Sequence, residues 1–387
     1  MNIETRLAQA GVKQDPRTGA ISTPIYLSAT FEHPEFGKST GFDYSRTANP
    51  TRKVLEETIA ALEEGHAGFA FSSGMAAITS VLFLFKPGDH LVISDDLYGG
   101  TYRLVEQVFK QYDITASYVD TSCLDEVKAA ITDKTAALFI ETPTNPLMKI
   151  TDLKAISEIA KENGLLTIVD NTFLTPYLQK PITLGADLVI HSGTKYLGGH
   201  NDVIAGLVVT ATEELSARIV AFQNGAGAIL SPFDSWLLLR GMKTLALRIE
   251  QQQKNAAQIA VFLAEHELVK KVYYPGLATA ADKVIIESQS RGYGGMLSFE
   301  VKNQEVVKAV LKHVNIISYA ESLGGVETLI TYPATQTHAD IPVEIREARG
   351  VTEGLLRLSV GIENAEDLIE DLKQALQYST SKGYVRS

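Results

Sequence analysis

The pattern of polar and apolar residues changes near residue 50. Before it, turn-forming residues are frequent and apolar residues follow no regular spacing. Such a stretch suits either a flexible tail or an arm that contacts a neighbouring subunit. Because Ile21, Ile25, Tyr26 and Leu27 are available for burial, we expect residues 1–48 to form the arm.

Beyond residue 50 the spacing becomes regular. Leu55, Ile59 and Leu62 recur at i, i+4 and i+7, which predicts one face of a helix. Gly65 follows and is expected to end that helix in the left-handed conformation.

Short apolar runs then alternate with helical segments as far as residue 210. The runs are GFAFSS, HLVIS, ITASYV, TAALFIE, LLTIVD, DLVIHS and IAGLVVT. Continuously apolar strands separated by helices predict an α/β fold with a buried, mostly parallel sheet between two helical layers. Beyond residue 239 the pattern is more helical, and YGGMLSFEV stands out as an isolated strand.

The chain has 387 residues, above the usual size of one hydrophobic core. We therefore expect a large domain over residues 49–242 and a smaller strand-and-helix domain over 243–387.

Composition narrows the classes of partner. A formal net charge of −11 disfavours nucleic acid as a partner, because proteins that bind nucleic acid carry a basic surface.

The single cysteine, Cys123, excludes a disulfide within the chain and fits a reducing cytosol. It is expected at a loop or helix start. The N-terminus lacks the apolar core of a secretory signal, and residues 219–239 are too polar to span a membrane. We expect a cytoplasmic protein with no membrane or metal site.

Two common nucleotide motifs are missing from the sequence. No GxGxxG follows the first predicted strand, and no GxxxxGK[ST] occurs. The glycine-rich segment at 292–295 precedes a strand and is expected to form a turn.

The segment DLVIHSGTKYLGGHND, residues 187–202, carries the strongest chemical signal. A strand ends in Ser192, and Thr194 and Lys195 follow at the carboxyl edge of the sheet, where α/β folds bind ligands. A lysine after a strand is usually a solvated loop charge. When it is buried near positive charge, its pKa falls and its amine reacts with an aldehyde, while the two hydroxyls suit a phosphate.

Two other segments supply complementary parts of such a site. LLTIVDN ends a strand in Asp170, which is either a loop carboxylate or the partner of a protonated pyridine nitrogen. SSGMAA, residues 72–77, predicts a strand-to-helix turn whose Gly74 and Met75 N–H groups would bind a phosphate. Together the segments favour pyridoxal 5′-phosphate (PLP).

Five motifs resemble those of the Cys/Met-metabolism family of fold-type I PLP enzymes. They are YSRTANPT (44–51), ETPTNP (141–146), VDNTF (169–173), SGTKYLGGH (192–200) and RLSVGIE (357–363). The resemblance runs along essentially the whole chain. It implies a large cofactor domain with a smaller α/β C-terminal domain, PLP as cofactor, small amino acids as substrates and a homotetramer built as a dimer of dimers.

The resemblance also implies a role for each matching residue. Lys195 would form the Schiff base with PLP and then shuttle protons, and Asp170 would pair with the pyridine nitrogen. Tyr98 would stack on the ring and take part in proton transfer. The expected phosphate ligands are Ser73, Gly74, Met75, Ser192 and Thr194, with Tyr44 and Arg46 from a neighbouring subunit. The substrate α-carboxylate would be bound by Arg357, helped by Asn145 and Ser322.

Members of the family catalyse different reactions. Three classes stay open: a transferase that replaces the γ-substituent of an activated homoserine with a thiol, a lyase that cleaves cystathionine or methionine, and a non-catalytic relative. The last is disfavoured because the matching residues are all present. Glu321 resembles the glutamate of γ-synthases and γ-lyases, where a carboxylate can hold a distal ammonium group. We predict γ-replacement, which forms cystathionine from an O-acylhomoserine and cysteine during methionine biosynthesis, with sulfide as a further acceptor.

Overall fold

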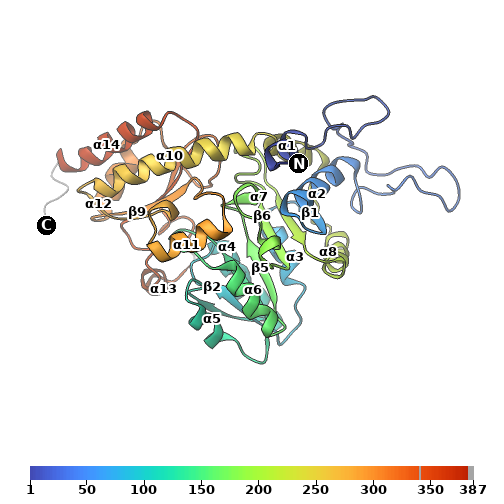
Figure 1. The fold of residues 1–387 in the computed structure, drawn as a ribbon, viewed down its shortest axis with the longest axis horizontal. Helices are drawn as coiled ribbons and strands as arrows, with labels where there is room; N and C mark the ends of the chain where they lie inside the picture. The colour runs from blue at the N-terminus through green and yellow to red at the C-terminus, as the bar shows by residue number, and fades with distance from the viewer. Residues whose placement is uncertain (340, 382–387) are drawn as a thin grey trace.

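The computed structural model describes residues 1–339 and 341–381 and contains two β-sheets with helices packed on them (Figure 1). Within these residues, no helix is both long and apolar enough to cross a membrane. Cys123 is exposed and caps the start of a helix, as expected.

The larger sheet has seven strands in the order β1-β7-β6-β5-β4-β2-β3. They are β1 (Ala67–Phe71), β2 (His90–Ser94), β3 (Thr115–Val119), β4 (Thr135–Glu141), β5 (Leu166–Asp170), β6 (Leu188–Ser192) and β7 (Gly206–Thr210). Strands β2 to β6 pair in parallel, whereas β7 runs antiparallel to β1 and β6. The α/β class and the mostly parallel sheet are confirmed.

Helices cover both faces of this sheet because its strands are apolar on both sides. In β5, Val169 packs into one core and Ile168 into the other. The first core contains α2 (Pro50–Glu63), α6 (Leu153–Glu162) and α9 (Pro232–Met242); the second contains α3 (Gly74–Leu82), α4 (Gly99–Gln107) and α8 (Glu213–Ala226).

The smaller sheet has the order β10-β11-β12-β9-β8. Its strands are β8 (Val269–Tyr273), β9 (Met296–Val301), β10 (Ser318–Tyr319), β11 (Leu329–Thr331) and β12 (Leu355–Ser359). Helices α10 (Leu245–Glu265), α12 (Gln304–His313) and α14 (Ala365–Ser381) form a core with it. The prediction of one isolated strand was wrong: β9 lies between β12 and β8. Other strands of this sheet escaped notice because β10 and β11 are very short and β8 carries two exposed lysines.

Short helices complete the described chain. They are α1 (Ile3–Ala8), α5 (Leu124–Ala130), α7 (Thr175–Leu178), α11 (Ala280–Gln289), α13 (Val343–Ala348) and the 3-10 turns η1 (Phe109–Tyr112), η2 (Pro181–Leu184) and η3 (Pro275–Leu277).

The end of α2 differs from the expectation. Glu64, not Gly65, takes the left-handed conformation, with φ 61°. Gly65 is needed for close packing instead, because a Cβ there would overlap the Val209 side chain.

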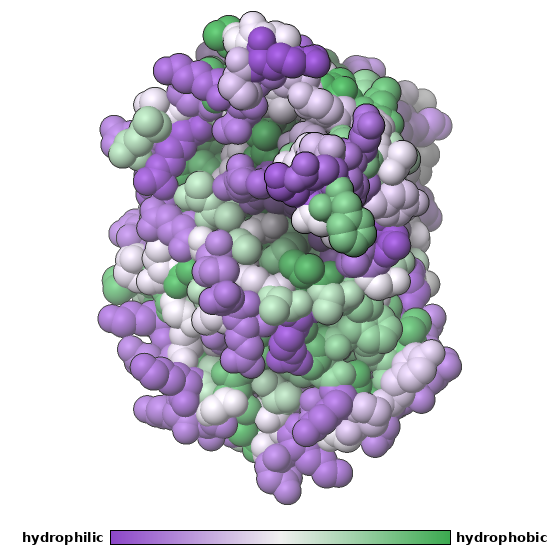
Figure 2. Space-filling model, turned by 90° about the vertical axis from the view of Figure 1, so that its right-hand side faces the viewer, coloured by the Kyte–Doolittle hydropathy of each residue, from purple (hydrophilic) through white to green (hydrophobic). Residues whose placement is uncertain are grey.

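The segment between α1 and α2 extends from the body as irregular loops (Figure 1). Ile21 and Leu27 on it are 71% and 75% exposed, so they are not buried within the chain. Figure 2 views the molecule from this side and shows apolar surface among polar side chains, with a hollow near the centre. The arm's contact with another subunit and the domain boundary near residue 242 stay predictions.

A substitution at Gly206 tests how closely β7 packs against the start of α3. A Cβ on Gly206 would overlap the carbonyl oxygen of Ser73, the residue that caps α3. Because backbone must move, Gly206→Ala is expected to lower the free energy of unfolding by about 2 kcal/mol. The control Gly225→Ala, in open space within α8, should raise it by about 0.5 kcal/mol. Chemical denaturation measures both; equal effects would contradict the packing argument.

Candidate active site

A cavity of about 250 Å³ lies at the carboxyl ends of β4, β5 and β6, beside the start of α3. All but two of the predicted site residues line it: Ser73, Gly74, Met75, Tyr98, Asn145, Asp170, Ser192, Thr194, Lys195, Glu321, Ser322 and Arg357. Segments far apart in sequence therefore meet here, as the strand-end argument predicted.

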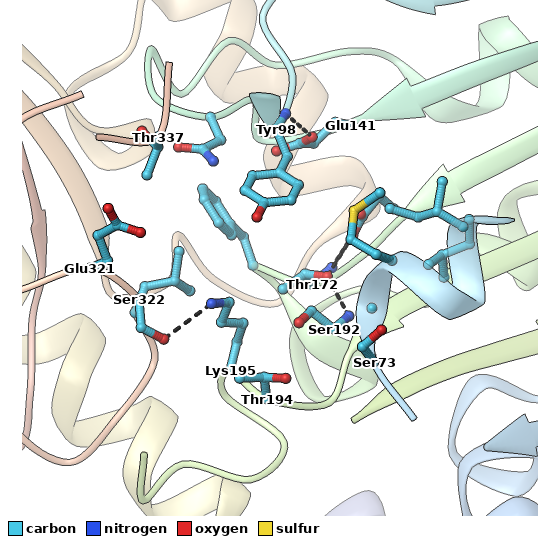
Figure 3. A pocket seen from close by; sticks show the side chains of 18 of the residues that line it. Ser73, Tyr98, Glu141, Thr172, Ser192, Thr194, Lys195, Glu321, Ser322 and Thr337 are labelled. Atoms are coloured by element: carbon cyan, nitrogen blue, oxygen red, sulfur yellow. Dashed lines mark hydrogen bonds between the residues drawn. The ribbon is translucent and has the colours of Figure 1, made fainter. Parts of the chain in front are cut away.

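Lys195 lies at the centre of this cavity (Figure 3). Its Nζ donates a hydrogen bond to Ser322 Oγ at 3.1 Å. Burial, and then the nearby positive charge of Arg357, lower the pKa of Lys195 to about 8, while Glu321 opposes the shift. The amine is thus partly unprotonated near neutral pH and able to act as a nucleophile or base.

Asp170 is the last residue of β5 and is oriented by a short turn. Its Oδ1 accepts hydrogen bonds from the Thr172 N–H at 3.0 Å and the Thr172 hydroxyl at 2.5 Å. Thr172 Oγ1 in turn accepts from the Ser192 N–H, which ties the ends of β5 and β6 together. Burial raises the pKa of Asp170 above its ordinary value, and the Thr172 hydrogen bonds and the charge of His191 offset only part of this rise.

The start of α3 faces the carboxyl ends of β5 and β6. Ser73 caps the helix by accepting from the Ala76 N–H, and a Cβ on Gly74 would lie only 3.1 Å from Ser192 Oγ. Glycine at residue 74 therefore lets the helix start approach the end of β6 closely. The Thr194 hydroxyl accepts from the Ala205 N–H at 3.0 Å.

Arg357 lies on β12 and is 2% exposed. Its Nη1 donates to Asn145 Oδ1 at 2.9 Å, and its Nη2 donates to the Ser322 carbonyl at 3.1 Å and to Thr331 Oγ1 at 3.2 Å. Its buried Nε has no hydrogen-bond partner in the described part of the chain. Such an N–H is a ready donor to a carboxylate that enters the cavity.

Ser322 connects the two sheets, although its backbone has φ 95°, a conformation that favours glycine. Behind it, a Cβ on Gly324 would overlap the backbone of Tyr196. This close packing of the loop on Lys195–Tyr196 holds the Ser322 hydroxyl near the lysine.

Tyr98 caps α4 and is 40% exposed. Its N–H donates to Glu141 Oε2 at 3.0 Å, and its ring lies so close to Gly100 that a Cβ there would overlap it. Glu321 and Thr337 lie on the wall away from Ser73 and Ser192 (Figure 3). The cavity thus has a cationic group at Arg357 and an anionic group at Glu321.

Tyr44 and Arg46 do not line the cavity of this chain. Arg46 Nη1 donates to Asn224 Oδ1 at 2.9 Å, and its guanidinium lies 5.6 Å from the Tyr44 ring centre. Their contact with a neighbouring subunit's site stays a prediction.

Sequence reasoning missed three polar residues of the cavity: Glu141, Thr172 and Thr337. Thr172 had a detectable signal, because a hydroxyl two residues after a strand-end Asp commonly binds that carboxylate. Glu141 ends its strand just as Asp170 does. Thr337 lies in an irregular segment and had no signal.

Residues 4–377 match the family model described as "Cys/Met metabolism PLP-dependent enzyme". The chain belongs to this family. It is 57% identical over 375 residues to a cystathionine gamma-synthase/O-acetylhomoserine (thiol)-lyase and 53% identical over 377 residues to a cystathionine gamma-lyase, both of Bacillus subtilis (strain 168). These alignments cover 97% of this chain and 96% and 100% of the relatives.

Solved structures agree with the family assignment. The structure of cystathionine gamma synthase from Xanthomonas oryzae pv. oryzae in complex with aminoacrylate and cysteine has a TM-score of 0.96 at 44% identity, covering 98% of this chain and 99% of that one. The fold is that of fold-type I PLP enzymes, and PLP is the cofactor of the family.

The residues of the cavity fit PLP. The lysine has a lowered pKa, Asp170 has an oxygen without a hydrogen-bond partner among residues 1–339 and 341–381, and the N-terminal end of α3 lies close against the Ser192 side chain. These groups suit an aldehyde, a protonated ring nitrogen and a phosphate, respectively.

The pKa of Lys195 gives a test of this electrostatic arrangement. The rate at which the apoprotein takes up PLP should rise with pH around a midpoint of about 8. Arg357→Gln removes a positive charge and should move the midpoint up, whereas Glu321→Gln removes a negative charge and should move it down. Stopped-flow absorbance measures the rates; a wild-type midpoint near 10.5, the ordinary lysine pKa, would contradict the arrangement.

Proposed function

We propose that this enzyme catalyses γ-replacement, forming cystathionine from an O-acylhomoserine and cysteine, with sulfide as a further acceptor. The observation that carries the proposal is the pair of opposite charges in one cavity, Arg357 and Glu321. Arg357 suits the α-carboxylate of the first substrate, and Glu321 suits the ammonium of the incoming cysteine.

The cofactor supplies an electron sink that makes the hydrogens on Cα and Cβ of a bound amino acid acidic. Lys195 Nζ takes the proton from Cα and moves protons between Cα and Cβ. Its lowered pKa suits this work, because a base is most effective when its pKa lies near the working pH.

The other residues hold the reacting groups in place. Asp170 would hold a negative charge beside the ring nitrogen of the bound cofactor, and Tyr98 would cover its ring. The Arg357 guanidinium, fixed by Asn145 and the Ser322 carbonyl, orients the α-carboxylate so that Cα faces Lys195. Loss of a proton from Cβ lets the acyloxy group leave Cγ as a carboxylate. The cysteine thiol then adds to Cγ and gives up its proton, and protons return to Cβ and Cα.

Cleavage of cystathionine is the second candidate. Cystathionine carries a distal ammonium that Glu321 would also bind. The 53% identity to a cystathionine gamma-lyase and the 52% identity to a cystathionine beta-lyase of Lactococcus lactis support this alternative.

We also infer a homotetramer built as a dimer of dimers, in which the arm brings Tyr44 and Arg46 to the phosphate site of the neighbouring subunit. The exposed apolar residues of the arm, Ile21 and Leu27, support this assembly. A cytoplasmic location remains a prediction from the composition.

Arg46→Ala tests the arm. Loss of a charge-assisted phosphate contact should weaken PLP binding about tenfold, while the subunit stays folded. Lys38→Ala is the matched control, since Lys38 lies on the arm and pairs with Glu35. Equilibrium dialysis against PLP measures the affinity. An unchanged affinity in Arg46→Ala would show that the arm does not reach the site.

Glu321→Gln tests the reaction. The wild type should show a higher kcat/KM for cystathionine synthesis than for cystathionine cleavage. The variant should lose roughly tenfold in kcat/KM for cysteine and much less for sulfide, which has no ammonium. Faster cleavage than synthesis in the wild type would overturn the synthase proposal. Equal losses with cysteine and sulfide would refute the role of Glu321.

A further inference from the structure

Glu141 is a buried acid in the cavity to which none of the roles above applies. It ends β4, and its Cα is the register partner of Asp170 on β5. Register partners on neighbouring strands project to the same face about 5 Å apart, and both side chains line the cavity. Glu141 is 7% exposed, so the site holds two carboxyl groups side by side with little water.

Glu141 is also the contact that anchors Tyr98. Its Oε2 accepts the Tyr98 N–H at 3.0 Å, and its own N–H donates to Ser94 Oγ at 3.1 Å. The end of β4 is thereby joined to the end of β2 and to the residue that precedes α4. The Tyr98 ring starts from this anchored backbone and packs on Gly100.

Two adjacent buried carboxylates do not both ionise readily. The charged groups around Glu141 are Asp170 on β5, Asp96 in the loop after β2 and Arg357 on β12. Arg357 forms no ion pair with Glu141 in the described chain, because its donors bind Asn145, Ser322 and Thr331. Burial, followed by the charges of Asp170 and Asp96, raises the pKa of Glu141 well above its ordinary value, and Arg357 offsets only part of this.

His338 does not alter this balance. It is buried, and its Nε2 lies 3.2 Å from the Asn145 carbonyl. Burial and the charge of Arg357 lower its pKa to about 4, so it is neutral at physiological pH.

We propose that Glu141 is a positioning residue that remains a neutral carboxylic acid beside Asp170, fixes Tyr98 through the backbone N–H and leaves the negative charge under the cofactor ring to Asp170. The acid does not exchange protons with the substrate. Because Glu141 is neutral, it can be buried beside Asp170 without repelling the negative charge that Asp170 presents to the cofactor nitrogen.

The proposal is tested with Glu141→Ala, Glu141→Gln and the control Glu158→Ala, an exposed glutamate on α6. Glu141→Ala removes the acceptor for Tyr98 N–H. It should weaken PLP binding to the apoprotein about tenfold. It should also lower kcat by roughly 100-fold with little change in KM, because the ring is displaced. Glu141→Gln keeps an oxygen acceptor and no charge, and should restore most of both losses.

Stability against pH tests the protonation state without any activity assay. Since the pKa of Glu141 is raised in the folded protein, its stabilising contribution is complete below 4.5, its ordinary pKa, and is lost as pH rises through the folded-state value. The Gln side chain in Glu141→Gln cannot ionise. The Tm of this variant minus the Tm of the wild-type apoprotein should therefore increase as pH rises. This comparison remains informative even if Glu141→Ala does not fold.

Two results would overturn the proposal. If Glu141→Gln is as impaired as Glu141→Ala and loses Tm relative to wild type at high pH, the carboxylate anion is the functional form. If Glu141→Ala matches Glu158→Ala in PLP affinity and kcat, Glu141 positions nothing. The PLP affinity and Tm in these comparisons do not depend on whether synthesis or cleavage is the main reaction, because neither measurement involves a substrate.

Discussion

The parallel register of β4, β5 and β6 is the constraint on which the active site depends. Pairing of Glu141 with Asp170, and of Asp170 with Ile190, brings three strand ends to one edge of the sheet. A slip of one residue would turn the side chain of Asp170 into the opposite core. The apolar residues on both faces of these strands exclude such a slip, so the hydrophobic cores and the chemistry depend on the same register.

The charged side chains buried near this edge of the sheet need hydrogen-bond partners to stabilise their charge. Arg248, 3% exposed, donates to the carbonyl groups of Tyr196 and Gly241 and so fixes the segment that follows Lys195. Arg52 is also buried and binds the Ser45 and Arg46 carbonyls at the base of the arm. These arginines bind mainly backbone oxygens, which hold loops in place without adding carboxylates near the site.

Local signals predicted the cofactor side of the site well. Lys195, Asp170 and Gly74 each follow a recognisable apolar strand, so their place at the sheet edge follows from the strand pattern. The substrate side was inaccessible to such reasoning, because Arg357 lies on β12, which pairs with β9 and with β11, a strand of only three residues. Its position was predicted only through the family resemblance.

Glu141 was overlooked because an acid that ends a strand looks like a solvated terminus until its register partner is known. The places of Tyr44 and Arg46 depend on a second chain, which no pattern within one chain determines.

The contact between Arg357 and Asn145 joins the two sheets across the cavity. Lys195 and Ser322 form a second such bridge, again with one residue from each side. Most of the smaller sheet packs into a core of its own, and Met296 of β9 reaches the core of the larger sheet, so a small shift between the sheets would separate these two bridges while the helices and strands themselves persist. A displacement of about 1 Å is enough to misalign reacting groups. Catalytic rate is therefore a more sensitive gauge of the relation between the two sheets than circular dichroism, which reports only the helices and strands within each of them.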